Sequence, residues 1–244
     1  MRLLLLSNSE AYGRGFLEHA FEAITDHLAG RDELLFVPFA LADHDWYAHR
    51  VGEALRPLGL RVRGLHAAAD PVAALREASA VFVGGGNTFR LLATLQRRGL
   101  VDPLREAVRD GGVPYLGSSA GTNLGAPSIR TTNDMPIVQP ESFTALGLVP
   151  FQINPHYLDP DPNSTFMGET RDQRLTEFLE ENDVPVLALR EGTWLQVRDG
   201  RAVLGGDLPA RLFRRGESPR ELPAGSDVSF LLDTVPVFDR PAQG

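Results

Sequence analysis

VPYLGSSAGTNLG, residues 113–125, runs from a short apolar strand through a glycine-rich turn into a helix start. Ser119 stands at the centre of that turn, in the order Gly-Ser-Ser-Ala-Gly. The flanking glycines lack side chains that would clash in a sharp strand-to-helix turn, and the helix N-terminus presents backbone N–H groups to the reacting centre. This is the pattern of a nucleophile elbow, and it predicts Ser119 as a nucleophile. The alternative is a tight strand-helix connection without chemistry.

Around this stretch, short apolar runs alternate with segments of helical periodicity. Each run has the length of a strand that is buried on both faces. Asp70-Pro71 and Asp102-Pro103 each place a capping Asp before a Pro at the first helical position. The pattern predicts an α/β fold, a mostly parallel sheet with helices on both faces. Its expected strands are residues 3–6, 34–38, 60–65, 80–83 and 113–116.

The second half of the chain has a different pattern. A helix over about residues 168–182 precedes a strand at 184–189, and Asp199-Gly200 is a hairpin turn signal between strands at 194–197 and 202–204. Residues 211–214 are expected to add another strand. We therefore expect an antiparallel C-terminal extension of a single domain over residues 1–232, followed by a tail at 233–244.

Composition excludes several kinds of chemistry. The 244 residues include no Cys and no Lys, so a thiolate nucleophile, a thiolate metal site and a Schiff-base or phosphate-loop lysine are absent. The net charge of −8 and the scattered arginines disfavour a nucleic-acid partner. The apolar run at residues 3–6 is too short for a signal peptide or a membrane span, so we expect a soluble, cytoplasmic protein without a membrane partner.

A second glycine-rich turn, residues 84–88 (GGGNT), follows the strand AVFV. The ligand site of an open parallel sheet lies outside the carboxyl ends of its strands, and both glycine-rich turns fall there. Backbone N–H groups of Gly85 or Gly86, together with Ala120, are the expected oxyanion hole. A loop that merely crosses the sheet edge is the alternative. A nucleotide phosphate cradle is disfavoured, because the glycine spacing of the dinucleotide fingerprint is missing.

A serine nucleophile needs a base and a group that orients the base. Of the six histidines, His156 is the candidate, since it ends the segment FQINPHY at an expected strand terminus. The other five are expected at the surface or its boundary. Two acids compete for the orienting role: Glu191, in the turn REGTW, and Asp134, in the polar loop RTTNDMP. Either acid could serve only in turn formation.

The chain resembles the peptidase E, or alpha-aspartyl dipeptidase, family of serine peptidases. The resemblance covers roughly residues 1–210, in family order. The matching stretches are LLLLSNS (3–9), VGGGNTF (83–89), GSSAGTN (117–123), IRTTNDMPIV (129–138), QINPHY (152–157), GETRDQR (168–174), EGTWLQV (191–197) and AVLGG (202–206). This resemblance implies a fold like that of class I glutamine amidotransferases, related to the flavodoxin-like sheet.

The resemblance also implies roles for single positions. Ser119 matches the family nucleophile and His156 the base, while Glu191 and Asp134 match two acids to which a catalytic role is assigned. The implied reaction is hydrolysis of dipeptides with an N-terminal Asp, without metal or cofactor. One departure is Ser118, where the family carries a bulky aromatic residue. Ser119 remains the predicted nucleophile, because only it is central in Gly-x-Ser-x-Gly.

A substrate with an N-terminal Asp carries a side-chain carboxylate, which a guanidinium can bind with two hydrogen bonds. Arg171 is the first candidate for this contact and Arg130 the alternate, with Asn87 and Thr88 as further substrate-binding positions. The expected partner is a small peptide, and a homodimer is left open. Three other hypotheses remain at this stage: a cyanophycinase-like beta-aspartyl peptidase, an α/β esterase that uses the same serine, and a binding protein without activity.

Overall fold

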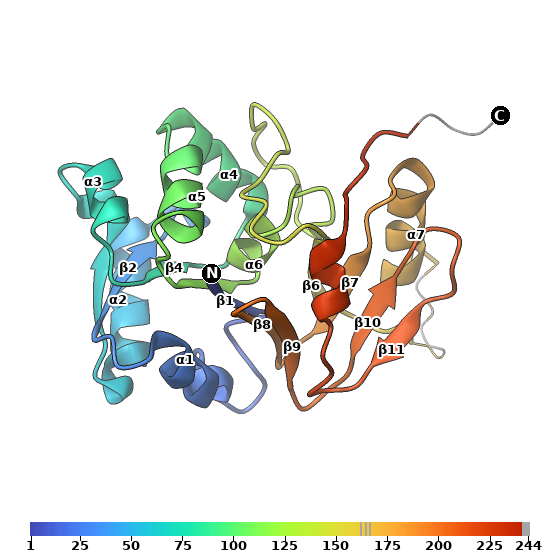
Figure 1. Cartoon of the computed structure of the whole chain (residues 1–244), viewed down its shortest axis with the longest axis horizontal. Coiled ribbons are helices and arrows are strands. Elements are labelled where there is room, and N and C mark those ends of the chain that lie inside the picture. Colours follow the sequence, from blue (N-terminus) through green and yellow to red (C-terminus); the bar gives the residue numbers. More distant parts are fainter. Residues whose placement is uncertain (162, 164, 166, 241–244) are drawn as a thin grey trace.

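The computed structural model describes every residue except 162, 164, 166 and 241–244. Within the described residues the strands form two sheets that lie next to each other (Figure 1). The larger sheet has seven strands in the order β3-β2-β4-β5-β1-β8-β9, and the smaller has four in the order β11-β10-β7-β6. The predicted α/β class, with a mostly parallel sheet, is confirmed.

Five strands of the larger sheet run parallel to one another. They are β1 (Arg2–Leu6), β2 (Glu33–Val37), β3 (Arg61–Gly64), β4 (Val81–Val83) and β5 (Tyr115–Ser118). All five predicted apolar runs thus form strands, shifted by no more than two residues. The central position of β1, between β5 and β8, brings the end of the first strand next to the serine turn.

The C-terminal extension divides between the two sheets. The hairpin of β8 (Thr193–Arg198) and β9 (Arg201–Gly206) joins the larger sheet, with β8 antiparallel to β1. The smaller sheet contains β6 (Gln152–Tyr157), β7 (Val186–Arg190), β10 (Ala210–Phe213) and β11 (Arg220–Leu222). In this sheet β6 and β7 are parallel, and β10 is antiparallel to both of its neighbours. The extension is therefore mixed rather than purely antiparallel.

Helices cover both faces of the larger sheet (Figure 1). The α-helices are α1 (Phe21–Leu28), α2 (His44–Leu55), α3 (Pro71–Arg76), α4 (Thr88–Arg97), α5 (Val101–Arg109), α6 (Ala120–Leu124) and α7 (Arg171–Glu181). Short 3-10 turns are η1 (Glu18–Ala20), η2 (Arg56–Leu58), η3 (Leu65–Ala67) and η4 (Ser229–Asp233). None of the helices in the described part of the chain is both long and apolar enough to cross a bilayer.

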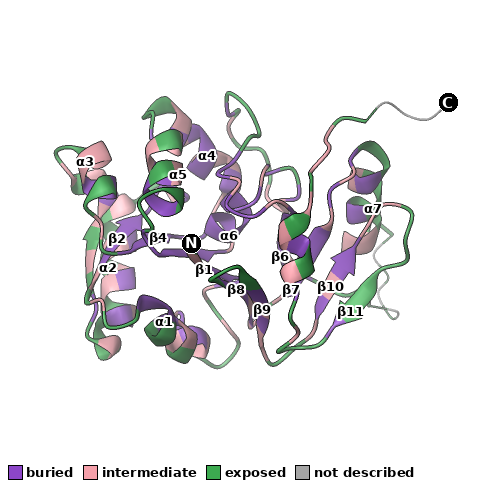
Figure 2. Ribbon diagram, viewed as in Figure 1, coloured by how far each residue is buried: buried purple, intermediate pink, exposed green. Residues whose placement is uncertain are grey.

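The side chains of β1 explain why its four leucines form an uninterrupted run. Leu3 and Leu5 pack into a core with α4 and α5, whereas Leu4 and Leu6 pack on the opposite face with α1 and α2. Side chains of a strand alternate between faces, so a strand covered on both sides needs apolar residues throughout. Figure 2 shows this interior as buried strands between partly exposed helices.

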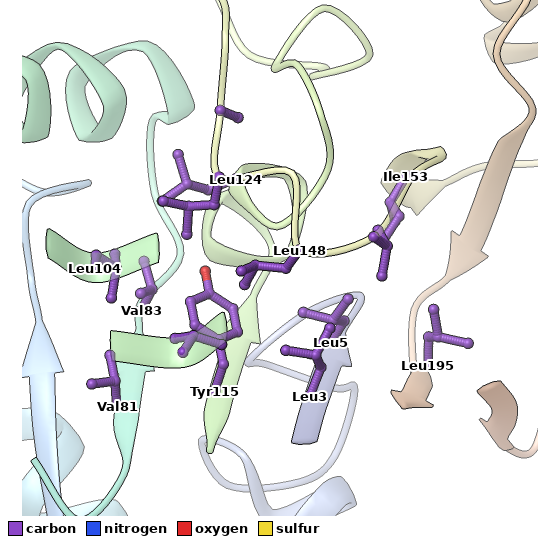
Figure 3. Close-up of a cluster of buried hydrophobic side chains, with 14 of the residues drawn as sticks. Leu3, Leu5, Val81, Val83, Leu104, Tyr115, Leu124, Leu148, Ile153 and Leu195 are labelled. Carbon is purple, nitrogen blue, oxygen red and sulfur yellow. The ribbon is translucent and has the colours of Figure 1, made fainter. Parts of the chain in front are cut away.

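The first of these cores continues from the larger sheet into the smaller one. It includes Leu195 on β8, Ile153 on β6 and Leu187 on β7 (Figure 3 labels the first two). A core shared by both sheets supports the single domain predicted over residues 1–232. In the segment from residue 233 onward, Val237 pairs with Asp183 beside α7, and Arg240 donates its N–H to the Glu181 carbonyl.

Two local predictions are corrected. Helix α5 begins at Val101, so Asp102 lies in its first turn instead of capping it, although Asp70 caps α3 as predicted. His27 was expected at the surface, but it is 2% exposed on the face of α1 that packs against the sheet. Burial lowers the pKa of His27 to about 4, because an imidazolium there would lose its hydration.

Candidate active site

The turn between β5 and α6 holds Ser119 in a strained conformation, with φ 53° and ψ −109°. Its backbone N–H donates to the Leu6 carbonyl at 3.1 Å, which anchors the turn to the end of β1. Gly121 is required for space, since a Cβ at that position would lie 2.0 Å from the Val83 carbonyl oxygen. The sharp turn keeps the Ser119 hydroxyl at the carboxyl edge of the sheet.

Three side chains from distant parts of the sequence form a hydrogen-bonded line at this edge. The Oγ of Ser119 lies 2.9 Å from Nε2 of His156, and Nδ1 of His156 lies 2.7 Å from Oε1 of Glu191. The His156 side chain is 39% exposed and that of Glu191 60% exposed, so both are open to solvent. A hydroxyl, an imidazole and a carboxylate in this order are the arrangement that activates a serine.

The neighbouring hydroxyl and the competing acid lie elsewhere. Ser118 is fully buried and its hydroxyl has no hydrogen-bond partner among the residues that the structure describes, so it is not open to solvent. Oδ2 of Asp134 accepts two hydrogen bonds from Thr88, one from the backbone N–H at 2.7 Å and one from the hydroxyl at 2.6 Å. In the described residues no hydrogen bond joins Asp134 to His156. Of the two acids, Glu191 is therefore the one that contacts His156.

The second glycine-rich turn lies directly against the nucleophile. A Cβ on Gly85 would stand 3.0 Å from Cβ of Ser119, so a side chain there would press on the serine. The hydroxyl of Tyr47 lies beside this turn, 2.6 Å from the point where a Cβ on Gly84 would stand, and burial raises its pKa. Gly86 has φ +129°, and a Cβ on it would lie 2.7 Å from the Ala40 carbonyl oxygen. Gly85 or Gly86, together with Ala120, stay the predicted oxyanion donors.

A pocket of about 260 Å³ opens beside the serine. Ser119, His156, Asp134 and Arg171 are among the residues that line it, together with Thr88, Ala120, Thr132, Asn133 and Pro155. Burial and the nearby charge of Arg174 lower the pKa of the Arg171 guanidinium, and the charge of Asp134 opposes this shift. Arg171 makes no ion pair with any described residue, so its hydrogen-bond donors remain available to a ligand. The pocket thus combines a nucleophile, a base and both signs of charge.

The model of peptidase family S51 matches residues 3–205, which include all of these side chains. The chain belongs to peptidase family S51. Its resemblance to this family, inferred above from sequence motifs, is thereby confirmed. Peptidase E of Streptomyces coelicolor is 66% identical over 239 residues, covering 98% of both chains. A Drosophila melanogaster protein named "Probable alpha-aspartyl dipeptidase" is 53% identical over 232 residues, 94% of this chain and 97% of its own.

The fold of this S51 chain also resembles a solved structure. The crystal structure of a peptidase from an acI-B1 actinobacterium superposes with a TM-score of 0.66 at 18% identity. The match covers 94% of the S51 chain and 96% of the actinobacterial one. At this identity the likeness concerns the fold alone. It extends over both sheets, since little of either chain is left uncovered.

Two of the predicted substrate-binding residues of the S51 chain have other partners. Arg130 forms two hydrogen bonds with Asp239, at 2.5 and 3.0 Å, and is not among the residues that line the pocket, so the structure does not bring this alternate candidate to the site. Asn87 accepts from the Arg90 N–H as the cap of α4 and donates to the Met135 carbonyl. It therefore holds the two loops together instead of facing the pocket.

Sequence reasoning overlooked the polar residues that support the site. Ser7 and Asn8, fully buried at the end of β1, bond to the backbones of His156 and Gly192. Thr132 donates its hydroxyl hydrogen bond to Thr88 from across the pocket. A signal existed, since polar residues directly after a buried strand stand at the ligand edge of a parallel sheet.

Proposed function

We propose that the chain is a serine dipeptidase that hydrolyses dipeptides with an N-terminal Asp through an acyl-enzyme. The observation that carries the proposal is the hydrogen-bonded line Ser119–His156–Glu191 beside a pocket that contains Arg171. Membership of family S51 and the names of its relatives point to the same activity. The reaction consumes one water and releases free Asp and the second amino acid.

In the first half of the reaction, Nε2 of His156 takes the hydroxyl proton of Ser119 while Oγ attacks the peptide carbonyl carbon. The 2.9 Å separation of these atoms permits direct proton transfer. Glu191 keeps Nδ1 protonated and stabilises the imidazolium that forms. The imidazolium then gives its proton to the leaving amine, and the second amino acid departs.

The negative oxygen formed by this attack is stabilised by backbone N–H groups. Ala120 is the first residue of α6, so its N–H has no partner within the helix. Gly85 or Gly86 supplies the second donor from the facing turn. Donors of this type contribute about 2.7–4 kcal/mol each to transition-state stabilisation. Water, deprotonated by His156, then attacks the ester, and Asp leaves Ser119.

The charges of the pocket match those of an N-terminal aspartyl residue. Arg171 binds the side-chain carboxylate through its planar set of donors. Oδ1 of Asp134 accepts none of the hydrogen bonds formed among the described residues, because both Thr88 donors use Oδ2. We assign this oxygen to the substrate ammonium. Asp134 would then be a binding residue, which explains why it lies at the pocket and apart from His156.

Four substrates test the proposal: Asp-Leu, Glu-Leu, beta-Asp-Arg and a nitrophenyl ester. We expect turnover of Asp-Leu alone, and no turnover by Ser119→Ala. Cleavage of beta-Asp-Arg in its place would indicate a cyanophycinase-like peptidase. Ester hydrolysis without Asp-Leu cleavage would indicate an esterase, and no hydrolysis of any substrate would indicate a binding protein. A cytoplasmic location and a homodimer remain predictions from the sequence.

A further inference from the structure

Strand β6 carries one extra residue at the point where it delivers His156. Its parallel pairing with β7 joins Asn154 to Ala188 and resumes at Tyr157 with Arg190, so three steps along β6 match two along β7. His156 adopts φ 53° within this irregularity. A bulge of this kind redirects a side chain, and the left-handed conformation costs about 1–2 kcal/mol. The bulge that aims His156 at Ser119 therefore needs support from its surroundings.

The hydroxyl of Ser7 occupies the gap that the bulge opens. It accepts the backbone N–H of His156 at 2.9 Å and donates to the Leu189 carbonyl of β7 at 2.8 Å. One hydroxyl thus replaces the missing connection between the two strands. Ser7 is fully buried, so water cannot take over these bonds if the hydroxyl is removed.

Asn8 supports the turn that carries Glu191 in a similar way. Its Oδ1 accepts the backbone N–H of Gly192 at 2.7 Å, and its Nδ2 donates to the Glu10 carbonyl at 2.7 Å. Gly192 directly follows Glu191 and has φ +80°. Glu191 itself is largely exposed and receives little support from packing. The side chain of Asn8 therefore fixes the turn from which the carboxylate reaches His156.

We propose that Ser7 and Asn8 are positioning residues of the peptidase, which hold His156 and Glu191 in line with Ser119. The proposal rests on the proposed function, in which this line performs the hydrolysis. Neither residue is among those that line the pocket beside Ser119. Loss of their bonds should consequently slow turnover without weakening substrate binding, since a shift of about 1 Å in a catalytic group can cost on the order of 100-fold in rate.

The kinetic test compares three variants on Asp-Leu. Ser7→Ala should lower kcat by about 10- to 100-fold and keep KM within about threefold of the wild type. Ser7→Thr keeps the hydroxyl, so its kcat should return most of the way to the wild-type value. The matched control is Ser128→Ala, which removes a buried hydroxyl whose one hydrogen bond to a described residue is accepted from the Arg130 N–H. The proposal is overturned if Ser7→Ala keeps kcat within threefold, if Ser128→Ala lowers kcat equally, or if Ser7→Thr restores nothing.

A second measurement separates this proposal from the proposed function. A wild type that fails to cleave Asp-Leu refutes the substrate assignment, whereas positioning is read from crystal structures of Ser7→Ala and Asn8→Ala. We expect the first variant to lengthen the 2.9 Å contact between His156 and Ser119 beyond hydrogen-bond reach. The second should do the same to the 2.7 Å contact with Glu191. Unchanged distances in both variants would overturn the proposal even if the enzyme cleaves Asp-Leu.

Discussion

Replacement of Glu191 by Gln distinguishes the two acids of the site. The change removes the charge that faces Nδ1 of His156 at 2.7 Å but keeps the size of the side chain. If Glu191 orients and stabilises the imidazolium, kcat for Asp-Leu should fall while KM stays nearly constant. Asp134→Asn is the matched control, because it removes the same charge from the opposite wall of the pocket.

The size of the effect follows from the distance and the exposure of the pair. Two unit charges about 4 Å apart interact by about 1 kcal/mol in water and about 4 kcal/mol near a protein surface. Because the Glu191 side chain is 60% exposed, solvent screening favours the lower part of this range. A loss of about 1–2 kcal/mol corresponds to about a 5- to 30-fold lower kcat. A buried acid in the same role would give a much larger loss.

The assay is steady-state hydrolysis of Asp-Leu at neutral pH, with Ser119→Ala as the inactive baseline. Asp134→Asn should raise KM and leave kcat within about threefold, since its carboxylate is assigned to the substrate ammonium. If Asp134→Asn lowers kcat more than Glu191→Gln does, the acid is misassigned. Near-normal turnover in both variants would refute the Ser–His–Glu mechanism itself.

Three further predictions concern binding and stability. Arg171→Met should raise KM for Asp-Leu by about 10- to 100-fold with little change in kcat, because a hydrogen bond to a charged group contributes about 1.5–3 kcal/mol to binding. The control Arg174→Met should raise KM less. Because His27 has a folded-state pKa of about 4 against 6.5 when unfolded, the unfolded chain binds the proton first, and stability should be lost as pH falls from 6.5 to 4. Urea unfolding of the wild type should show that the free energy of unfolding falls by about 3 kcal/mol across this range, and His27→Gln should abolish this fall. An equal fall in the wild type and in His27→Gln would contradict the assignment to His27. Gly121→Ala should destabilise the fold by more than about 3 kcal/mol, because its Cβ would lie 2.0 Å from a carbonyl oxygen. The control Gly200→Ala lies in open space at φ +77°, so it should cost only about 1–2 kcal/mol. Similar urea midpoints for the two variants would contradict the steric argument.

The parts of the fold that sequence predicted well are those with a local cause. Strand β1 was recognisable because a strand buried on both faces must be apolar at every position. Helix α3 was recognisable from Asp70, which accepts the N–H groups of Val72 and Ala73 as a cap. The start of α5 was missed, because Leu100 precedes it without a side-chain cap. The second sheet was missed because the pairing of β6, β7 and β10 depends on contacts between distant segments.

In the site, too, sequence predicted the features that have a local cause and not those that depend on contacts between distant segments. Ser119 was identified from its own turn, and His156 and Glu191 from polar residues at expected strand ends. Local sequence left open the choice between Glu191 and Asp134, because both lie in polar loops. What separates them is a contact across 35 positions between His156 and Glu191, which no local pattern encodes. The pairing of Arg130 with Asp239 could not be predicted for the same reason, since the two residues lie 109 positions apart.

The placement of β1 between β5 and β8 has a consequence for biosynthesis. Residues 1–8 are synthesised long before the outer neighbour of β1, which begins only at Thr193. A polypeptide released before that residue contains Ser119, His156 and Glu191 but leaves one edge of its central strand unpaired. Segments so far apart along the chain must be joined before the site exists. We therefore expect the site to assemble late in folding, after β1 and β8 have paired, since the paired residues Leu6 and Trp194 lie 188 positions apart.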